Sequence, residues 1–338
     1  MWSEDILDDL ISTPSAALVE DISKIDGDIM VLGAGGKMGP SLAVLIHRAI
    51  AQAGIDKKVF AVSRFTDPWV VAHLQKNNVE VISADLTEDG ALERIPYAKN
   101  IIYMVGKKFG TLGNESETWE INASLPTLVS RKLTKRNFVV FSTGNIYPAS
   151  KVTSGGCSEE QSPAPVGEYA MSSLARERIF ERAANKYGSN VLIYRLNYAV
   201  DLRYGVLYDL ADKVLKGEPI SLRVPTFNCV WQGYANEVAV RALLCAASPA
   251  NVLNVTGPET VSVAATAKAL ALHLGKAPIF EGEAADTALL SNAAKCFTLF
   301  GYPNVTLNTL IRWQAEWILN DGRALGKPTH FEERKGKY

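Results

Sequence analysis

Three glycines at three-residue spacing follow a short apolar segment near the beginning of the chain. Residues 29–32 are Ile-Met-Val-Leu, the turn 33–39 reads Gly-Ala-Gly-Gly-Lys-Met-Gly, and apolar residues at helical spacing follow. Such a turn lets backbone N–H groups, here including those of Lys37 and Met38, approach a pyrophosphate at a helix N-terminus, where the helix dipole also favours negative charge. We interpret Gly33 as the tight turn, Gly36 as the point of close approach to phosphate and Gly39 as a helix–strand contact. The segment favours a dinucleotide-binding fold, although three glycines alone do not exclude an ordinary βα turn.

Apolar segments of strand length then alternate with helical segments. The expected strands are 59–62, 79–82, 101–105, 138–141 and 191–194. Because strands that are apolar throughout are buried on both faces, this order predicts a doubly wound, Rossmann-like α/β fold around a parallel sheet.

The second half of the sequence is less regular and predicts a smaller substrate lobe interleaved with the sheet. We expect an N-terminal helical extension over 1–27, a dinucleotide-binding domain over 28–200 and mainly a substrate-binding lobe over 201–338. Short strands near 228 and 253 are expected to return to the main sheet. The charged tail, 332–338, is expected to fray.

The composition describes a globular chain with little net charge. With 338 residues, 47% of them hydrophobic, and a net charge of −1, the sequence offers no general attraction to nucleic acid or to an anionic membrane. No apolar run approaches the ~18 residues of a membrane span, and the acidic N-terminus does not read as a secretory signal. The four cysteines and four histidines lack metal-ligand spacing. We therefore predict a cytoplasmic protein with a small-molecule substrate and no metal site.

The end of the second expected strand carries Ser63-Arg64, where proteins that prefer NAD usually have an acidic residue for the ribose hydroxyls. A guanidinium suits a 2′-phosphate instead. Lys37, in the glycine turn, is expected to reach the same phosphate. NADP is therefore the predicted cofactor and NAD the alternative, although single basic residues are more often solvated surface charges. Asp85-Leu86 fits a pair that binds adenine, or a helix N-cap.

Two further segments carry hydroxyl groups suited to chemistry at a carbon–oxygen bond. Ser142-Thr143 ends the fifth expected strand, and Tyr169 begins a helical segment. A hydroxyl and a phenol placed in this way can grip one carbonyl or carbinol oxygen, so that one group moves the proton and the other orients the substrate. Ligands of α/β sheets bind at the carboxyl edge, so we expect a nicotinamide ring beside them.

With these motifs in this order, the chain resembles an extended short-chain dehydrogenase/reductase of the NAD-dependent epimerase/dehydratase family over roughly residues 28–320. The motifs are the glycine turn, Asp85-Leu86, Met104-Val105-Gly106, Asn122, Ser142-Thr143, Tyr169 and Arg195-Leu196-Asn197-Tyr198. The resemblance implies that Tyr169 is the catalytic acid/base and that Thr143, with Ser142, anchors the substrate oxygen. It also implies that Asn122 positions the nicotinamide half and that Val105 and Gly106 contact the cofactor.

The resemblance breaks at one position. The family motif is Tyr-x-x-x-Lys, and Ser173 stands where the lysine would hold the nicotinamide ribose and lower the tyrosine pKa from about 10. Three interpretations stay open: Tyr169 works with another positive charge, such as oxidised nicotinamide; the chemistry is slow or different; or the protein binds cofactor without turnover. Lys108 is the leading candidate for the other cation. An equally good interpretation is that Lys107 and Lys108 are two solvated lysines of a surface loop.

The absence of two family motifs narrows the range of expected substrates. Gly144-Asn145 replaces the Asp-Glu pair of the family's 4,6-dehydratases, which disfavours a dehydratase. The segment 221–227 lacks the diphosphate-binding arginine of nucleotide-sugar enzymes, so a free sugar, sugar acid or other polyol is favoured. Arg203 and Arg223 are candidates for meeting an anionic group, or surface charges.

We therefore predict an NAD(P)-dependent oxidoreductase of carbohydrate metabolism that moves hydride between nicotinamide and a secondary alcohol or ketone. A sugar or nucleotide-sugar epimerase that transfers hydride transiently is the alternative, and a catalytically lapsed NADP-binding regulatory protein is the second. The resemblance also implies a homodimer through helices near 115–134 and 168–187.

Overall fold

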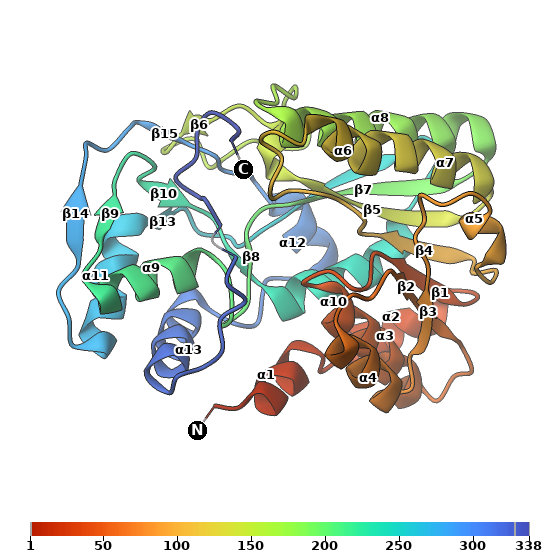
Figure 1. Ribbon diagram of the computed structural model, residues 1–338, viewed down its shortest axis with the longest axis horizontal. Coiled ribbons are helices and arrows are strands. Elements are labelled where there is room, and N and C mark those ends of the chain that lie inside the picture. The colour runs from red at the N-terminus through yellow and green to blue at the C-terminus, as the bar shows by residue number, and fades with distance from the viewer. Residues whose placement is uncertain (1, 328, 338) are drawn as a thin grey trace.

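The computed structural model describes residues 2–327 and 329–337, and its centre is a parallel sheet of seven strands (Figure 1). The strands lie in the order β12-β7-β5-β4-β1-β2-β3, and every neighbouring pair is parallel. Their bounds are β1 Ile29–Leu32, β2 Val59–Ser63, β3 Glu80–Ser83, β4 Asn100–Tyr103, β5 Asn137–Thr143, β7 Asn190–Leu196 and β12 Asn251–Val255. The chain steps outward from β1 in both directions, which is the order of a Rossmann-like fold. The predicted fold class is confirmed.

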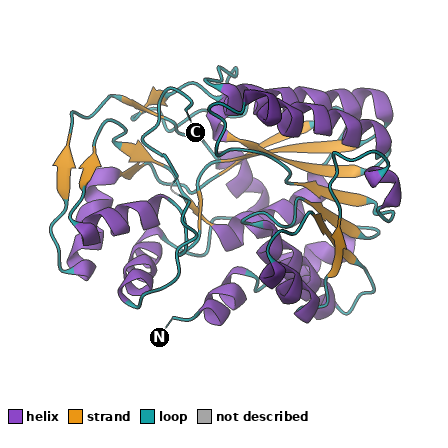
Figure 2. Cartoon of the chain, viewed as in Figure 1, coloured by secondary structure: helices purple, strands orange, loops and turns teal. Residues whose placement is uncertain are grey.

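Helices cover both faces of the sheet (Figures 1 and 2). In β1, Ile29 and Val31 face one hydrophobic core, whereas Met30 and Leu32 face the other. This alternation is what a strand buried between two helical layers requires. The first layer contains α2 (Ala16–Lys24), α3 (Gly39–Ala53), α4 (Pro68–Lys76), α10 (Gln232–Arg241) and α12 (Ala294–Phe300). The second contains α5 (Ala91–Arg94), α6 (Glu115–Trp119), α7 (Leu125–Lys132) and α8 (Glu168–Tyr187).

A smaller lobe with its own hydrophobic core lies beside the sheet (Figure 1). Its helices are α9 (Val206–Lys216), α11 (Val263–Leu274) and α13 (Leu307–Leu319). Short strand pairs complete the chain: β6 (Ser150–Lys151) with β15 (Thr287–Ala288), and β9 (Pro219–Ser221) with β14 (Ile279–Glu281).

The N-terminal extension joins the two cores. Helix α1 (Glu4–Ile11) buries Leu7 and Ile11 in the core of the small lobe. Helix α2 packs Leu18 and Ile22 into the layer that covers the sheet, after Ser15 caps its N-terminus by accepting a hydrogen bond from the N–H of Leu18. The extension therefore helps to fix the small lobe relative to the sheet.

The strands expected to return to the main sheet divide into two groups. β12 lies at its edge beside β7, but the segments near 228 pair elsewhere. β10 (Thr226–Phe227) pairs with β13 (Val261–Ser262), and β11 (Val230–Trp231) pairs with β8 (Ala199–Val200). The expectation for residue 228 is therefore wrong, because strands of two residues are too short for their pattern to indicate a partner.

The expectation of a frayed tail is also wrong for the described residues of 332–338, which exclude Tyr338. Phe331 is buried in the core of the small lobe, and Glu332 forms an ion pair of 2.6 Å with Lys213. Arg334 donates hydrogen bonds to the carbonyl oxygen and hydroxyl of Thr287. A charged tail is expected from its sequence to be solvated, but here Glu332 and Arg334 have partners in the fold.

None of the helices in the described ranges combines the length and apolarity needed to cross a membrane. The four cysteines are all free thiols. Within the same ranges, no three His, Cys, Asp or Glu side chains come together as a metal site would require.

Candidate active site

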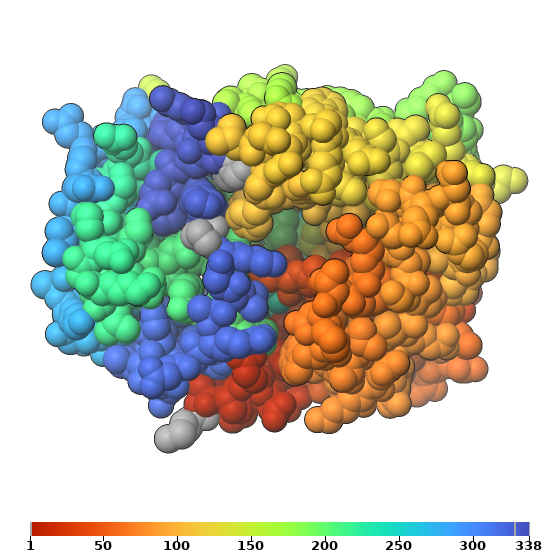
Figure 3. All heavy atoms as spheres, in the orientation of Figure 1, coloured from red at the N-terminus to blue at the C-terminus, as the bar shows by residue number. Residues whose placement is uncertain are grey.

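A cleft at the carboxyl ends of the strands consists of two adjoining cavities. Both are lined by Gly33, Gly36, Met104 and Gly106, which follow β1 and β4. The first, called here the lobe-side cavity, also contacts the small lobe, and the second, the β2–β3 cavity, lies at the ends of those two strands. The space-filling view shows the hollow between the lobes, with C-terminal residues at its rim (Figure 3). The cleft therefore offers room for one ligand with two linked halves.

Two glycines of the turn, Gly33 and Gly39, lie where any side chain would collide with the neighbouring backbone. Gly33 has φ +88°, and a Cβ there would lie 2.8 Å from the nitrogen of Val105. A Cβ at Gly39 would lie 2.4 Å from the carbonyl oxygen of Ala34, so this glycine allows contact with the turn itself. Helix α3 begins without a side-chain N-cap. The N–H groups of Lys37 and Met38, just before the helix, and the exposed Gly36 thus fit the pyrophosphate of a dinucleotide.

A basic and an acidic side chain lie close together in the wall of the β2–β3 cavity. Ser63, Arg64, Asp85 and Leu86 all line it, as does Val105. The Arg64 side chain is 66% exposed, and its Nη1 lies 3.8 Å from Oδ2 of Asp85. Hydrogen bonds from the Thr87 hydroxyl and N–H, assisted by Arg64, hold the pKa of Asp85 below its usual range. A basic and an acidic group therefore both face the place expected for adenosine.

Lys37 does not converge with Arg64, contrary to the sequence expectation. Its side chain lines only the lobe-side cavity, and its Nζ lies 3.0 Å from the centroid of the Tyr204 ring. The turn directs this side chain toward the small lobe, which sequence spacing alone does not reveal. A 2′-phosphate near Arg64 would not meet the Lys37 ammonium.

Asn122 is fully buried in a single turn of π-helix, Glu120–Ser124, between α6 and α7. Its Oδ1 accepts from the N–H of Lys107 at 2.9 Å and from Nη2 of Arg176 at 2.6 Å. Its Nδ2 donates to the carbonyl oxygen of Lys107 and to Oγ of Ser172. Single π turns occur often at functional sites, and this one clamps the loop after β4 to α8.

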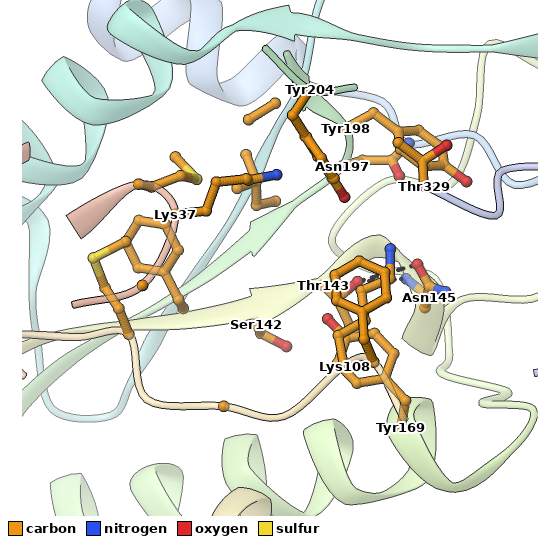
Figure 4. A pocket seen from close by; sticks show the side chains of 18 of the residues that line it. Lys37, Lys108, Ser142, Thr143, Asn145, Tyr169, Asn197, Tyr198, Tyr204 and Thr329 are labelled. Carbon is orange, nitrogen blue, oxygen red and sulfur yellow. Dashed lines mark hydrogen bonds between the residues drawn. The ribbon is translucent and has the colours of Figure 1, made fainter. Parts of the chain in front are cut away.

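Thr143 and Tyr169 line the same cavity, as their sequence context predicts (Figure 4). Burial raises the pKa of Tyr169, whereas hydrogen bonding to Thr143 and the positive charge of Arg176 oppose that rise. Ser142 also lines the cavity, but its hydroxyl donates at 2.5 Å to Oε1 of the buried Glu177. Thr143 and Tyr169 therefore face the cavity together, whereas the Ser142 hydroxyl connects the strand to α8.

The small lobe supplies the opposite wall. Tyr198, Tyr204 and Thr329 line the lobe-side cavity with Lys108, which follows β4 (Figure 4). The Lys108 Nζ lies 6.0 Å from the centroid of the Tyr169 ring. Burial lowers the pKa of Lys108 to about 8.

Arg203 is not available to a substrate. Its guanidinium lies 2.8 Å from Asp201, 2.8 Å from Glu4 and 2.9 Å from Asp8. Two of these carboxylates belong to the N-terminal extension, whose packing the sequence did not indicate.

Comparison with known proteins agrees with this geometry. The profile of the NAD dependent epimerase/dehydratase family matches residues 29–222, which is more than half of the chain. The chain belongs to that family. No curated protein matches it.

Solved structures of the family share the fold of this epimerase/dehydratase-family protein. A UDP-glucuronic acid 4-epimerase from Bacillus cereus, solved with UDP-glucuronic acid and NAD, has a TM-score of 0.69 and 18% identity, over 87% of this chain and 99% of that one. A dTDP-glucose 4,6-dehydratase from Bacillus anthracis, solved with NAD, has a TM-score of 0.72 and 16% identity, over 88% and 97%. A UDP-glucose 4-epimerase from Thermotoga maritima, solved with UDP-glucose, has a TM-score of 0.69 and 19% identity, over 87% and 99%.

Within this family member, Arg176 is the cation that sequence reasoning missed. Ser173, at the position of the motif lysine, is buried, and hydrogen bonding to its side chain opposes the rise in the pKa of Tyr169 without supplying a charge. Arg176 lies seven residues after Tyr169 on the same face of α8, and its Nη1 donates to the carbonyl oxygen of Phe141 at 2.9 Å. The guanidinium lines the cavity below Gly106. The helical spacing Tyr169–Ser173–Arg176 is the sequence signal that would have identified it.

Proposed function

We propose that this protein is an NAD(P)-dependent oxidoreductase that transfers hydride between nicotinamide and a secondary alcohol or ketone of a small polyhydroxylated substrate. The observation that carries the proposal is the presence of Thr143 and Tyr169 in a cavity that shares its wall with the glycine turn. Residues 28–200 would bind mainly the dinucleotide, and 201–338 mainly the substrate.

The residues of the cleft fit a dinucleotide. The glycine turn, with the N–H groups of Lys37 and Met38, would hold the pyrophosphate, and the β2–β3 cavity would hold adenosine. The loop with Val105, Gly106 and Lys108, fixed by Asn122, would face the nicotinamide half. When bound, the nicotinamide ring would supply or accept the hydride.

The proton would move at the phenolic oxygen of Tyr169. Its hydroxyl would donate a proton to a substrate ketone in reduction, and its phenolate would remove a proton from an alcohol in oxidation. Thr143 would orient the same substrate oxygen. The charge of Arg176, assisted by Lys108, would replace the missing motif lysine in favouring the phenolate.

NADP is the proposed dinucleotide, because Arg64 directly follows Ser63, the last residue of β2, and faces the β2–β3 cavity with most of its side chain exposed. Its weak pairing with Asp85, at 3.8 Å, leaves the guanidinium able to turn to a 2′-phosphate. Asp85 supports the alternative, NAD, because its carboxylate can accept hydrogen bonds from ribose hydroxyls. The structural relatives named above were solved with NAD where a dinucleotide is present.

We also propose a homodimer formed through the outer faces of α6, α7 and α8. Three large apolar side chains are exposed there, namely Trp119 (37%), Leu128 (47%) and Met171 (38%). Exposed apolar side chains gathered on neighbouring helices are typical of a protein–protein interface.

The experiment that tests the proposed reaction follows nicotinamide absorbance with the full chain, NADP⁺ or NAD⁺, and a panel of sugars, sugar acids and sugar phosphates. We expect net reduction of the dinucleotide with at least one substrate. Conversion of substrate without net reduction would identify the alternative, an epimerase. Tight binding of the dinucleotide with no conversion of any substrate would contradict both and favour a regulatory protein.

A further inference from the structure

The ammonium of Lys37 is directed into the lobe-side cavity without an anionic partner. It starts from the glycine turn and meets the face of Tyr204 in the small lobe, 3.0 Å from the ring centroid (Figure 4). Across the described ranges, no carboxylate pairs with its Nζ and no hydrogen-bond acceptor reaches it. An aromatic face offsets only part of the cost of removing an ammonium from water.

The carboxylates nearest to Lys37 are committed elsewhere. Asp201 pairs with Arg203 at 2.8 Å, and Oδ2 of Asp209 accepts hydrogen bonds of 2.8 and 2.5 Å from the N–H and hydroxyl of Thr329. Burial, together with the positive charges of Lys108 and Lys327, lowers the pKa of Lys37 well below its ordinary value. The charged form of Lys37 is therefore disfavoured unless an anion lies beside it.

The structure assigns this corner of the cavity to a single anionic group of the substrate, a carboxylate or a phosphate, which Lys37 Nζ binds directly and Lys108 attracts by its charge. The inference rests on the proposed function and narrows its substrate from polyols in general to acidic ones. The cofactor pyrophosphate is a less suitable occupant, because the Lys37 side chain leaves the turn and ends at Tyr204, whereas the pyrophosphate belongs at the N–H groups of the turn. Lys37 thus acts twice: its backbone faces the dinucleotide and its side chain faces the substrate.

The test measures equilibrium binding by calorimetry, without turnover, for the full chain with and without saturating NADP⁺. The probes are D-glucuronate, D-glucose 6-phosphate and neutral D-glucose, and NADP⁺ is titrated separately. The variant is Lys37→Met, which keeps the backbone and most of the volume. Lys107→Met is the matched control, because Lys107 carries the same charge on the neighbouring loop but lines only the β2–β3 cavity, where it pairs with Glu117.

We expect at least one anionic probe to bind more tightly than glucose and to lose about tenfold or more in affinity with Lys37→Met, as the loss of a charge-assisted hydrogen bond predicts. Lys107→Met should keep the affinity for that probe within about twofold. Lys37→Met should also keep its affinity for NADP⁺ and its resistance to denaturant. The better of the two anionic probes identifies carboxylate or phosphate as the recognised group.

Three results would overturn the inference. In the first, the anionic probes bind no better than glucose, and in the second they bind the Lys37→Met variant as tightly as the wild-type protein. In the third, the variant loses affinity for NADP⁺ but keeps its affinity for the anionic probe, which would show that the Lys37 side chain binds the cofactor pyrophosphate. Because no step requires turnover, failure of hydride transfer leaves this result intact, and failure here leaves the proposed reaction intact.

Discussion

The replacement of Glu177 by glutamine tests whether the buried charges behind Thr143 and Tyr169 hold α8 against the sheet. Glu177 is fully buried, and its carboxylate accepts from Nε and Nη2 of Arg195 at 3.0 and 2.7 Å and from Oγ of Ser142 at 2.5 Å. Arg195 is the penultimate residue of β7 and is itself 3% exposed. In Glu177→Gln, an amide N–H₂ replaces one oxygen and faces a donor, while the Arg195 charge stays buried without its counter-ion.

Removal of one partner from a buried ion pair costs about 3–5 kcal/mol, and we expect about 3 kcal/mol because glutamine keeps one acceptor and the volume. That corresponds to roughly two powers of ten in the unfolding equilibrium. The assay is denaturant unfolding followed by circular dichroism and by tryptophan fluorescence, with the slope checked for two-state behaviour.

Glu181→Gln is the matched control on the same helix. Its partner, Arg178, is 56% exposed, so we expect a loss of less than about 1 kcal/mol. If the free energy of unfolding fell no more in Glu177→Gln than in this control, the buried pair would contribute no more to stability than a surface pair. That result would refute the reasoning.

Three further predictions concern the site and the assembly. Arg64→Ala should weaken NADP⁺ binding about tenfold to a hundredfold and leave NAD⁺ within about twofold, measured by equilibrium titration; equal losses for both would contradict a 2′-phosphate contact. Arg176→Met removes a positive charge that lowers the pKa of Tyr169, so this pKa should rise, and it should rise less in Arg176→Lys; an unchanged midpoint in the tyrosinate absorbance, read as the difference from the same protein with Tyr169→Phe, would refute the role. Leu128→Asp should convert the dimer to a monomer in light scattering after size exclusion, whereas a monomeric wild-type protein would contradict the proposed dimer.

Short-range patterns predicted most of the large domain. The glycine turn, the apolar strands and the hydroxyl pair at Thr143 and Tyr169 are local signals, and the parallel sheet brings the carboxyl ends of its strands to one edge. The NADP preference and the catalytic roles stay predictions. They depend on how the protein interacts with a dinucleotide and a substrate, which the fold alone does not determine.

Long-range packing explains what the sequence did not reveal. The direction of Lys37 depends on Tyr204 in another lobe, and the neutralisation of Arg203 depends on Glu4 and Asp8 at the other end of the chain. Arg176 is different, since its helical spacing from Tyr169 was available in the sequence. The family motif places the cation at position 173, so the prediction did not consider Arg176 on the next turn of the helix.

The most direct test of the central claim is a comparison of the wild-type protein with Tyr169→Phe in the nicotinamide absorbance assay, on the best substrate of the panel and at saturating dinucleotide. The phenylalanine keeps the ring and removes the proton-transferring oxygen. We predict that dinucleotide binding is retained and that the turnover rate falls by about a hundredfold or more, the size expected for loss of a general acid/base. A variant that turns over at the wild-type rate would contradict the assignment of Tyr169 as the group that moves the proton.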